Sequence, residues 1–204
     1  MSSFRQARHE YDGQAHVYDR RWADYLQRST DELLRLLDLR AGDRLLDVGC
    51  GTGVLLDQIS RRGSVVCLYG IDPSSGMLRR ARQRLADRAH LIQGEGAALP
   101  FADRSFGTVV STSSLRYWPD AGDGFREIAR VLQPKGRLLL LDWCGDAMRH
   151  RLLAWWLTRT GRVGGRIYRL DELKELLAAA GFSAEVECVK AGWYWRFNVA
   201  RATL

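Results

Sequence analysis

A short glycine-rich stretch that follows an apolar run carries the clearest chemical signal in the sequence. The run at 45–48 includes Asp47, and glycines follow at alternate positions, Gly49, Gly51 and Gly53. Glycine is needed where a ligand must approach the backbone, because a Cβ atom would block it. Apolar residues at helical spacing begin directly after the third glycine, so free N–H groups at that helix start would face the ligand. The stretch predicts a buried strand, a tight turn and a helix start that together hold a small ligand.

A second carboxylate stands at the end of the next apolar run. Asp72 lies 19 residues after Gly53. An acid at the end of a second strand, near this distance, accepts hydrogen bonds from both hydroxyls of a ribose. The glycine spacing is G-x-G-x-G, because Val54 occupies the position where a dinucleotide fingerprint needs glycine. The pair of features therefore favours a nucleoside ligand over a pyrophosphate.

Residues 47–53 resemble motif I of the class I S-adenosylmethionine-dependent methyltransferases, and the resemblance extends over about residues 35–200. The segment 94–101 resembles the family's G-D-A-x-x-L-P-F segment, and 130–140 resembles its R-V-L-K-P-G-G segment. The nearest relatives by pattern are the quinone, sterol and phospholipid-amine enzymes of the methyltransferase domain 11 group. The resemblance implies an α/β, Rossmann-like fold with a mostly parallel seven-stranded sheet. The implied strand order is 3-2-1-4-5-7-6, with strand 7 antiparallel and helices on both faces.

The resemblance also implies a cofactor, S-adenosylmethionine, with S-adenosylhomocysteine as product. Glu95 stands where the family usually has Asp, whose carboxylate accepts from the adenine amino group, and the N–H of Gly96 or Ala97 would meet a ring nitrogen. Met77 matches a Met or Leu that lies against the adenosine, although its helical spacing equally suits a core position. The residues expected to bind the cofactor are Asp47, Gly49, Cys50, Gly51, Gly53, Asp72, Pro73, Met77, Glu95, Gly96, Ala97, Ser111 and Thr112.

The acceptor implied by the resemblance is a small molecule, apolar or lipid-like, methylated by direct SN2 transfer. The segment 15–22 resembles the family's A-x-x-Y-D entry, in which the aromatic residue closes over cofactor or substrate. An electron-rich ring would suit a sulfonium, although it could equally pack on the core. The candidates for shaping the acceptor side are Tyr11, Tyr18, Arg116 and Tyr117.

No general base is evident in the sequence, and the catalytic residues stay unknown. Many relatives carry two histidines near positions 116 and 117, and this chain has none there. The Asn/Asp-Pro-Pro-aromatic motif of nucleobase N-methylating enzymes is also absent after the strand expected at 106–112, which argues against nucleic acid as the acceptor.

Two other functions share part of the pattern. A nicotinamide-dependent oxidoreductase would have the same glycine turn and Asp72, but the glycine spacing, Asp47 and the Leu-Pro-Phe segment argue against it. A methyltransferase-like binding protein without catalysis would retain every cofactor feature. The intact motif I disfavours that alternative without excluding it.

Composition predicts one globular domain of 204 residues, with 46% hydrophobic and 27% charged residues. No run is long and apolar enough to span a membrane, and residues 1–10 lack the apolar core of a signal peptide. Cys50, Cys67 and Cys144 are expected to be buried thiols in a reducing cytoplasm, and the scattered histidines predict no metal site. The net charge of +7, almost all from arginine, favours a solvated basic surface over a nucleic-acid site.

These features must be positioned by four predicted parts: an N-terminal helical cap (1–40), a cofactor-binding core (41–142), a substrate-side insertion (143–170) and a C-terminal helix with a strand pair (171–204). The cap is expected to hold two helices broken near Ser29, with Ser29 and Glu32 as a capping box. Strands are expected at 44–48, 65–71, 90–93, 106–112 and 137–142, with a turn at 133–136. The last part should hold a helix at 171–180 capped by Gly181, then strands at 182–189 and 192–200.

Two amphipathic or charged helices have open interpretations. In the insertion, Leu152, Trp155, Trp156 and Arg159 follow helical spacing. Such a stripe could lie on a membrane surface, roof an apolar pocket or face the core. The helix expected after Asp72 carries several arginines predicted to form an exposed face, namely Arg79, Arg80, Arg82, Arg84 and Arg88. Peripheral membrane contact and the oligomeric state stay open.

Overall fold

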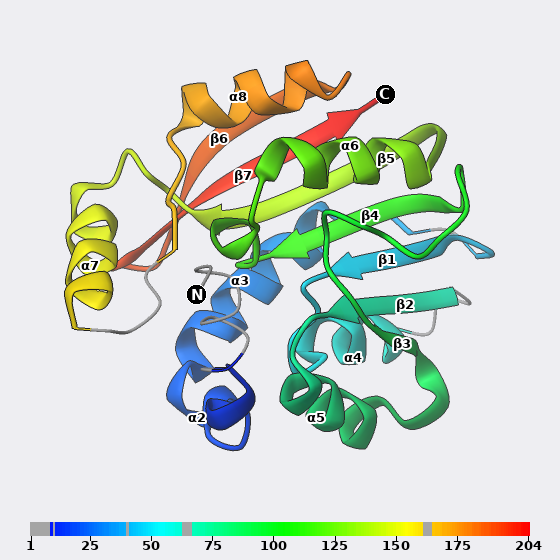
Figure 1. Cartoon of the computed structure of the whole chain (residues 1–204), viewed down its shortest axis with the longest axis horizontal. Helices are drawn as coiled ribbons and strands as arrows, with labels where there is room; N and C mark the ends of the chain where they lie inside the picture. Colours follow the sequence, from blue (N-terminus) through cyan, green and yellow to red (C-terminus); the bar gives the residue numbers. More distant parts are fainter. Residues whose placement is uncertain (1–8, 10, 40, 63–66, 161–164) are drawn as a thin grey trace.

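The computed structural model describes residues 9, 11–39, 41–62, 67–160 and 165–204. It contains one seven-stranded sheet in the order β3-β2-β1-β4-β5-β7-β6 (Figure 1). Neighbouring strands from β3 to β5 are parallel, and β7 is antiparallel to both β5 and β6. The predicted fold class and strand order are confirmed. The strands are β1 (Arg44–Val48), β2 (Cys67–Asp72), β3 (His90–Gln93), β4 (Phe106–Thr112), β5 (Leu132–Trp143), β6 (Ser183–Ala191) and β7 (Trp195–Thr203).

Helices cover both faces of the sheet. Helices α6 and α8 lie on one face, whereas α3, α4 and α5 lie on the other (Figure 1). Helix α7 stands away from both layers, at the carboxyl edge of β5. The helices are α2 (Tyr18–Arg21), α3 (Ala23–Leu36), α4 (Val54–Ser60), α5 (Ser75–Leu85), α6 (Ala121–Val131), α7 (Met148–Arg159) and α8 (Leu170–Ala179), with short 3₁₀ turns at Ala86–Arg88 and Leu115–Tyr117. None of these helices is long and apolar enough to cross a bilayer.

The alternation of side chains along β1 builds both layers of core. Leu46 and Val48 pack in the cluster that contains Phe125 of α6, whereas Leu45 packs in the cluster that contains Leu56 of α4. Successive residues of a strand point to opposite faces, so a strand covered on both sides needs apolar residues at every position. The one departure in the buried part of β1 is a carboxylate, at the position before Val48.

The N-terminal helices break at a different place from the one predicted. Trp22 separates α2 from α3, and Ser29 lies inside α3. The Ser29 hydroxyl donates to the Leu26 carbonyl within the same helix, at 3.2 Å. The predicted capping box of Ser29 and Glu32 is therefore wrong: a serine that satisfies its hydroxyl on the preceding turn can sit in a helix interior.

Two further expectations are corrected. The predicted turn at 133–136 is part of β5, which begins at Leu132; its register against β4 shifts there, and Lys135 has a positive φ of 64°. Cys67 is exposed at the first position of β2, whereas Cys50 and Cys144 are buried as predicted. The predicted positions Gly63 and 65–66 lie outside the described residues.

The C-terminal part matches its prediction. Leu173 and Leu177 of α8 are buried, Leu176 is partly buried against the same core, and Gly181 has a φ of 90° two residues after the helix. The two strands pair as β6 and β7, with bounds one to three residues later than expected.

Two glycines of α6 differ in the space available for a Cβ atom and so allow a matched test of how closely this helix packs. A Cβ atom at Gly124 would lie 2.5 Å from Cζ3 of Trp118, whereas one at Gly122 would meet only the flexible ends of Asp120 and Arg126, at 3.1 and 3.4 Å. Alanine in a helix is usually more stable than glycine by about 0.5–1 kcal/mol. We expect Gly122→Ala to stabilise and Gly124→Ala to destabilise by about 1–3 kcal/mol, because the latter overpacks the ring. Urea unfolding measures both, and a stabilising Gly124→Ala would contradict this packing.

Candidate functional site

A pocket opens at the carboxyl ends of β1, β2, β3 and β4. The chain order of the sheet reverses between β1 and β4, and open α/β sheets bind their ligands in the crevice at such a switch point. The lining residues come from the β1–α4 turn, the β2–α5 turn, the loop after β3, the segment after β4 and the N-terminal helices.

The pocket brings most of the predicted cofactor residues together. Those that line it are Gly49, Cys50, Gly51, Asp72, Pro73, Met77, Glu95, Gly96 and Thr112. Four others lie outside its lining, namely Asp47, Gly53, Ala97 and Ser111. Of the acceptor-side candidates, Tyr11, Tyr18 and Tyr117 line the pocket. Arg116 does not: it is buried beside Asp142, with 3.4 Å between Nη1 and Oδ1.

The β1–α4 turn has the backbone that its glycines predict. Gly49, Gly51 and Gly53 all have positive φ, at 82°, 55° and 75°. A Cβ atom at Gly49 would lie 2.6 Å from Ser114 Oγ, and one at Gly53 would lie 2.8 Å from Leu85 Cδ1, so packing alone demands glycine at both. At Gly51 a Cβ atom would meet nothing within 4 Å. The middle of the turn therefore leaves open space against the backbone, as a ligand would require.

Asp72 holds this turn from the neighbouring strand. Its Oδ2 accepts from the Gly51 N–H at 2.9 Å, and its Oδ1 accepts from the Ser74 N–H at 2.8 Å. Each carboxylate oxygen has a second lone pair, so both can accept a further hydrogen bond from a ligand. Burial raises the pKa of Asp72 to about 6, against the opposing effect of the two backbone N–H groups.

Asp47 is a buried carboxylate without a hydrogen-bond partner among the described residues. It is 1% exposed, and both of its oxygens are unsatisfied. Burial, and then the nearby charge of Asp72, raise the pKa of Asp47 to about 8. An isolated buried carboxylate is unfavourable unless it is protonated or meets a cation. Without a cation beside it, the Asp47 carboxyl therefore keeps its proton near neutral pH.

Three tyrosines form an aromatic wall. The ring of Tyr11 lies edge-on to those of Tyr18 and Tyr117, with centroids 5.7 and 5.3 Å away. Burial raises the pKa of Tyr11 and of Tyr18 well above the usual phenol value. Both phenols stay protonated at neutral pH, so they offer π faces and hydrogen-bond donors rather than a general base.

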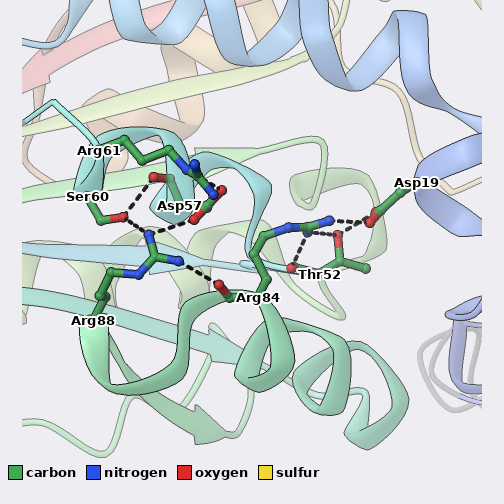
Figure 2. Close-up of polar contacts among 7 residues, drawn as sticks. All are labelled: Asp19, Thr52, Asp57, Ser60, Arg61, Arg84 and Arg88. Carbon is green, nitrogen blue, oxygen red and sulfur yellow. Dashed lines mark hydrogen bonds and ion pairs between the residues drawn. The ribbon is translucent and has the colours of Figure 1, made fainter.

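The N-terminal segment is fastened to this pocket at two points. Asp12 Oδ1 accepts from the Gly76 N–H at 2.8 Å and from the Ser74 hydroxyl at 2.7 Å. Further along, Arg84 of α5 donates to Asp19 Oδ2 and to the Thr52 carbonyl, each at 2.5 Å (Figure 2).

The prediction that the arginines of α5 form an exposed face is thus only partly correct. Arg79, Arg80 and Arg82 are exposed, but Arg84 is half-buried in the contacts with Asp19 and Thr52. Arg88, although exposed, binds Ser60 and Asp57 of α4 (Figure 2).

The loop after β3 is fixed by α6. Arg130 donates to the carbonyls of Leu99 and Phe101 at 2.9 and 2.8 Å, and Glu127 accepts from the Leu99 N–H at 2.7 Å. This clamp positions the preceding residues Glu95 and Gly96 in the pocket wall. Arg130 begins the segment 130–140 that resembles the family's R-V-L-K-P-G-G segment.

Several lining residues were not predicted. Ser29 and Thr30 of α3 are buried polar residues in line with Leu26 and Leu33, so two hydroxyls interrupting an apolar helical stripe were the available signal. Ser113 follows β4 with a positive φ of 62°, and its hydroxyl is hydrogen-bonded to Tyr25. No sequence pattern points to that conformation, because serine rarely adopts it.

The comparisons with known proteins agree with this geometry. Residues 46–140 match the methyltransferase domain family. The chain is 32% identical to 27-O-demethylrifamycin SV methyltransferase of Amycolatopsis mediterranei, over 86% of this chain and 72% of that protein. It is 39% identical to demethylmenaquinone methyltransferase of Corynebacterium kroppenstedtii over 52% of this chain, but spans only 44% of that protein.

A solved structure extends the likeness in fold to nearly the whole chain. It comes from a complex between the Trm112 methyltransferase activator of Haloferax volcanii and a methyltransferase. The TM-score is 0.82 at 20% identity, covering 96% of this chain and 97% of that one. This structure shows the shared fold. The curated relative from Amycolatopsis mediterranei and the family match show that the chain belongs to the class I S-adenosylmethionine-dependent methyltransferases.

Replacement of Asp47 by asparagine should change how stability depends on pH. Between the ordinary carboxyl pKa of 3.8 and the raised value of about 8, the folded state keeps a proton that the unfolded chain has released. The free energy of unfolding of the wild type therefore falls as pH rises through this range. Asp47→Asn should gain stability relative to the wild type by up to about 1.4 kcal/mol per pH unit. Urea unfolding across the range, with exposed Asp87→Asn as control, measures the difference, and a pH-independent difference would contradict it.

The contact between Arg84 and Asp19 should stabilise the docked N-terminal segment. Arg84→Met keeps the aliphatic stem but removes three polar contacts, and we expect a loss of about 1 kcal/mol because the pair is partly exposed. Hydrogen exchange at residues 11–21 should accelerate as well. Arg79→Met removes an exposed arginine from the same helix and should change neither readout. Equal effects of the two variants would show that the contact does not hold the segment.

Proposed function

We propose that the pocket binds S-adenosylmethionine and that the protein transfers its methyl group to a small, apolar or lipid-like acceptor. The observation that carries the proposal is the pairing of a glycine turn open at Gly51 with two buried carboxylates, Asp47 and Asp72. The donor carries a ribose, whose hydroxyls one carboxylate could bind, and a methionyl end with an ammonium and a sulfonium that the other could face.

Each part of the pocket has a proposed task. Asp72 would accept from the ribose hydroxyls through the lone pairs that Gly51 and Ser74 leave unused. Asp47 would lie beneath the cationic methionyl end, which supplies the positive charge that its burial requires. The segment 94–96, which precedes the residues held by Arg130 and Glu127, would meet the adenine, with Glu95 and the Gly96 N–H as its polar groups.

The bound donor would supply an electrophilic methyl group. The neutral rings of the aromatic wall would face the sulfonium. Such rings stabilise a cation, and as protonated phenols they do not compete as nucleophiles. The remaining task of the protein is to align acceptor and donor and to exclude water. Such positioning alone can lower a barrier by about 7–11 kcal/mol. The pocket tyrosines stay protonated, so Tyr11 and Tyr18 would not take a proton from the acceptor.

The acceptor class rests on the pocket and on the relatives. The three tyrosines and Trp118 give the pocket's acceptor side an aromatic character, which suits an apolar ring or chain. The names of two relatives refer to a demethylrifamycin and to a demethylmenaquinone as substrates. These names support an apolar acceptor without identifying it.

Calorimetry with S-adenosylmethionine tests the cofactor assignment. We expect Asp72→Asn to weaken binding by about 10- to 100-fold, the usual effect of losing charge-assisted hydrogen bonds. Exposed Asp87→Asn should bind as the wild type does, and circular dichroism checks that both variants fold. Binding of NADH in place of the donor would overturn the assignment in favour of an oxidoreductase. A panel of phenols, quinols, amines and lipids, followed by detection of S-adenosylhomocysteine, then identifies the acceptor; binding without any turnover would indicate a catalytically silent protein.

A further inference from the structure

The most prominent apolar surface of the described chain lies outside the pocket, on α7. Large hydrophobic side chains are exposed there: Met148 by 74%, Leu152 by 60%, Trp155 by 56% and Trp156 by 47%. They follow the spacing i, i+4, i+7, i+8 and so share one side of the helix. Trp193, 83% exposed in the turn between β6 and β7, is joined to this helix because Arg149 donates to its carbonyl at 3.2 Å. These five residues are called the α7 face.

The inner side of the same helix is packed. His150 and Ala154 are buried, and the ring of His150 lies 5.6 Å from that of Trp143 at the end of β5. The core-facing alternative for the tryptophan stripe is therefore wrong: different residues face the core, and the stripe faces outward. Among the described residues, Leu204 is the one exposed large hydrophobic residue outside the α7 face. The exposed apolar surface is therefore concentrated on that face.

The charges carried by α7 and by the β6–β7 turn are of one sign. The acid that reaches this turn from α3, Asp24, is paired with Arg28 and accepts from the Trp195 ring N–H. Residues 147–160 contain Arg149, Arg151 and Arg159 and no acidic residue, and residues 188–200 contain Lys190 and Arg196 and no acidic residue. Arg159 lies over the ring of Trp155, 4.8 Å from its centroid. The nearest acid before the helix, Asp146, is occupied by the Leu170 N–H and by Arg169. A partner must therefore offer negative charge beside an apolar phase.

We propose that the α7 face docks the protein on an anionic lipid membrane. A bilayer surface supplies acidic headgroups for the arginines and an acyl boundary for the tryptophans, which are favoured at that depth. A two-fold contact with a second copy fits less well, because it would bring arginines of both copies together. The helix stands out from the body of the protein, so its face is accessible to a flat surface (Figure 1).

Docking would also orient the pocket. Helix α7 follows β5 at the carboxyl edge of the sheet, where β1, β2 and β4 end at the pocket. The edge that bears the pocket would then lie near the bilayer, from which an apolar acceptor could enter. This consequence rests on the proposed function, whereas docking itself does not.

Flotation with lipid vesicles, in the absence of any methyl donor, tests the docking. We expect the wild type to float with vesicles of equal parts phosphatidylglycerol and phosphatidylcholine. Its binding to vesicles of phosphatidylcholine alone should be at least tenfold weaker, and high salt should weaken its binding to the anionic vesicles. Tryptophan emission should shift to shorter wavelength on binding.

Two variants separate the apolar and the charged contributions. Leu152→Ser/Trp156→Gln should lower binding at least tenfold, and both sites are exposed, so the fold should persist. Arg151→Gln/Arg159→Gln should lower binding to the anionic vesicles but not to phosphatidylcholine vesicles. Arg79→Gln/Arg82→Gln removes the same charge from the exposed side of α5 and should leave most of the binding to anionic vesicles.

Three results would overturn the proposal. The first is no flotation of the wild type with either vesicle. The second is equal loss in the two arginine variants, which would indicate net charge rather than a surface. The third is sedimentation of the wild type as a dimer that Leu152→Ser/Trp156→Gln makes monomeric, without vesicle binding, which would assign the face to a second copy. Unchanged donor binding in Asp72→Asn, which would contradict the proposed function, would leave all these outcomes unchanged, so the two proposals fail separately.

Discussion

The hydrogen bonds that join the end of β2 to the glycine turn organise the whole carboxyl edge. Gly49 and Cys50 donate to the Ile71 carbonyl, and Gly51 donates to the Asp72 carboxylate. These bonds fix the left-handed backbone of the turn against the neighbouring strand. The start of α4, the β2–α5 turn and Ser114 are then placed against a rigid reference. A shift of the turn would therefore disturb the carboxylate of Asp72 and the β2–α5 turn that it holds.

The energetic cost of this arrangement falls on Asp47. An apolar residue at that place in β1 would pack without penalty, yet the strand carries a carboxylate with no partner among the described residues. Proteins retain such groups at sites where a ligand completes the interaction. Arg116 differs from Asp47, because its buried charge is balanced by Asp142 within the protein. The fold therefore pairs one buried ionisable group with an opposite charge, whereas the other has no such partner among the described residues.

Local sequence patterns were sufficient for the sheet and for the backbone of the glycine turn. The alternating glycines, the acid at the end of β2 and the apolar strands each specify a backbone geometry directly, so their positions followed from the chain. Contacts between distant segments did not follow. The link from Arg84 to Asp19 spans two helices far apart in sequence, and nothing local distinguishes Arg84 from the exposed Arg80 or Arg82. The helix break at Trp22 was missed, and the direction of the α7 tryptophans was left open. Periodicity defines a stripe, but tertiary packing decides which side of the helix is covered.

The proton that Asp47 holds has a consequence for measuring ligand affinity. With a pKa of about 8, the carboxyl is largely protonated at neutral pH. A cation bound above it would expel that proton into the buffer, so the observed heat of binding would include the ionisation enthalpy of whichever buffer is used. Titrations in phosphate and in Tris should then give different heats at the same affinity, and the slope against buffer enthalpy counts the protons released. The proton released by Asp47 would thus show whether a cation is bound beside it, without a label and without turnover.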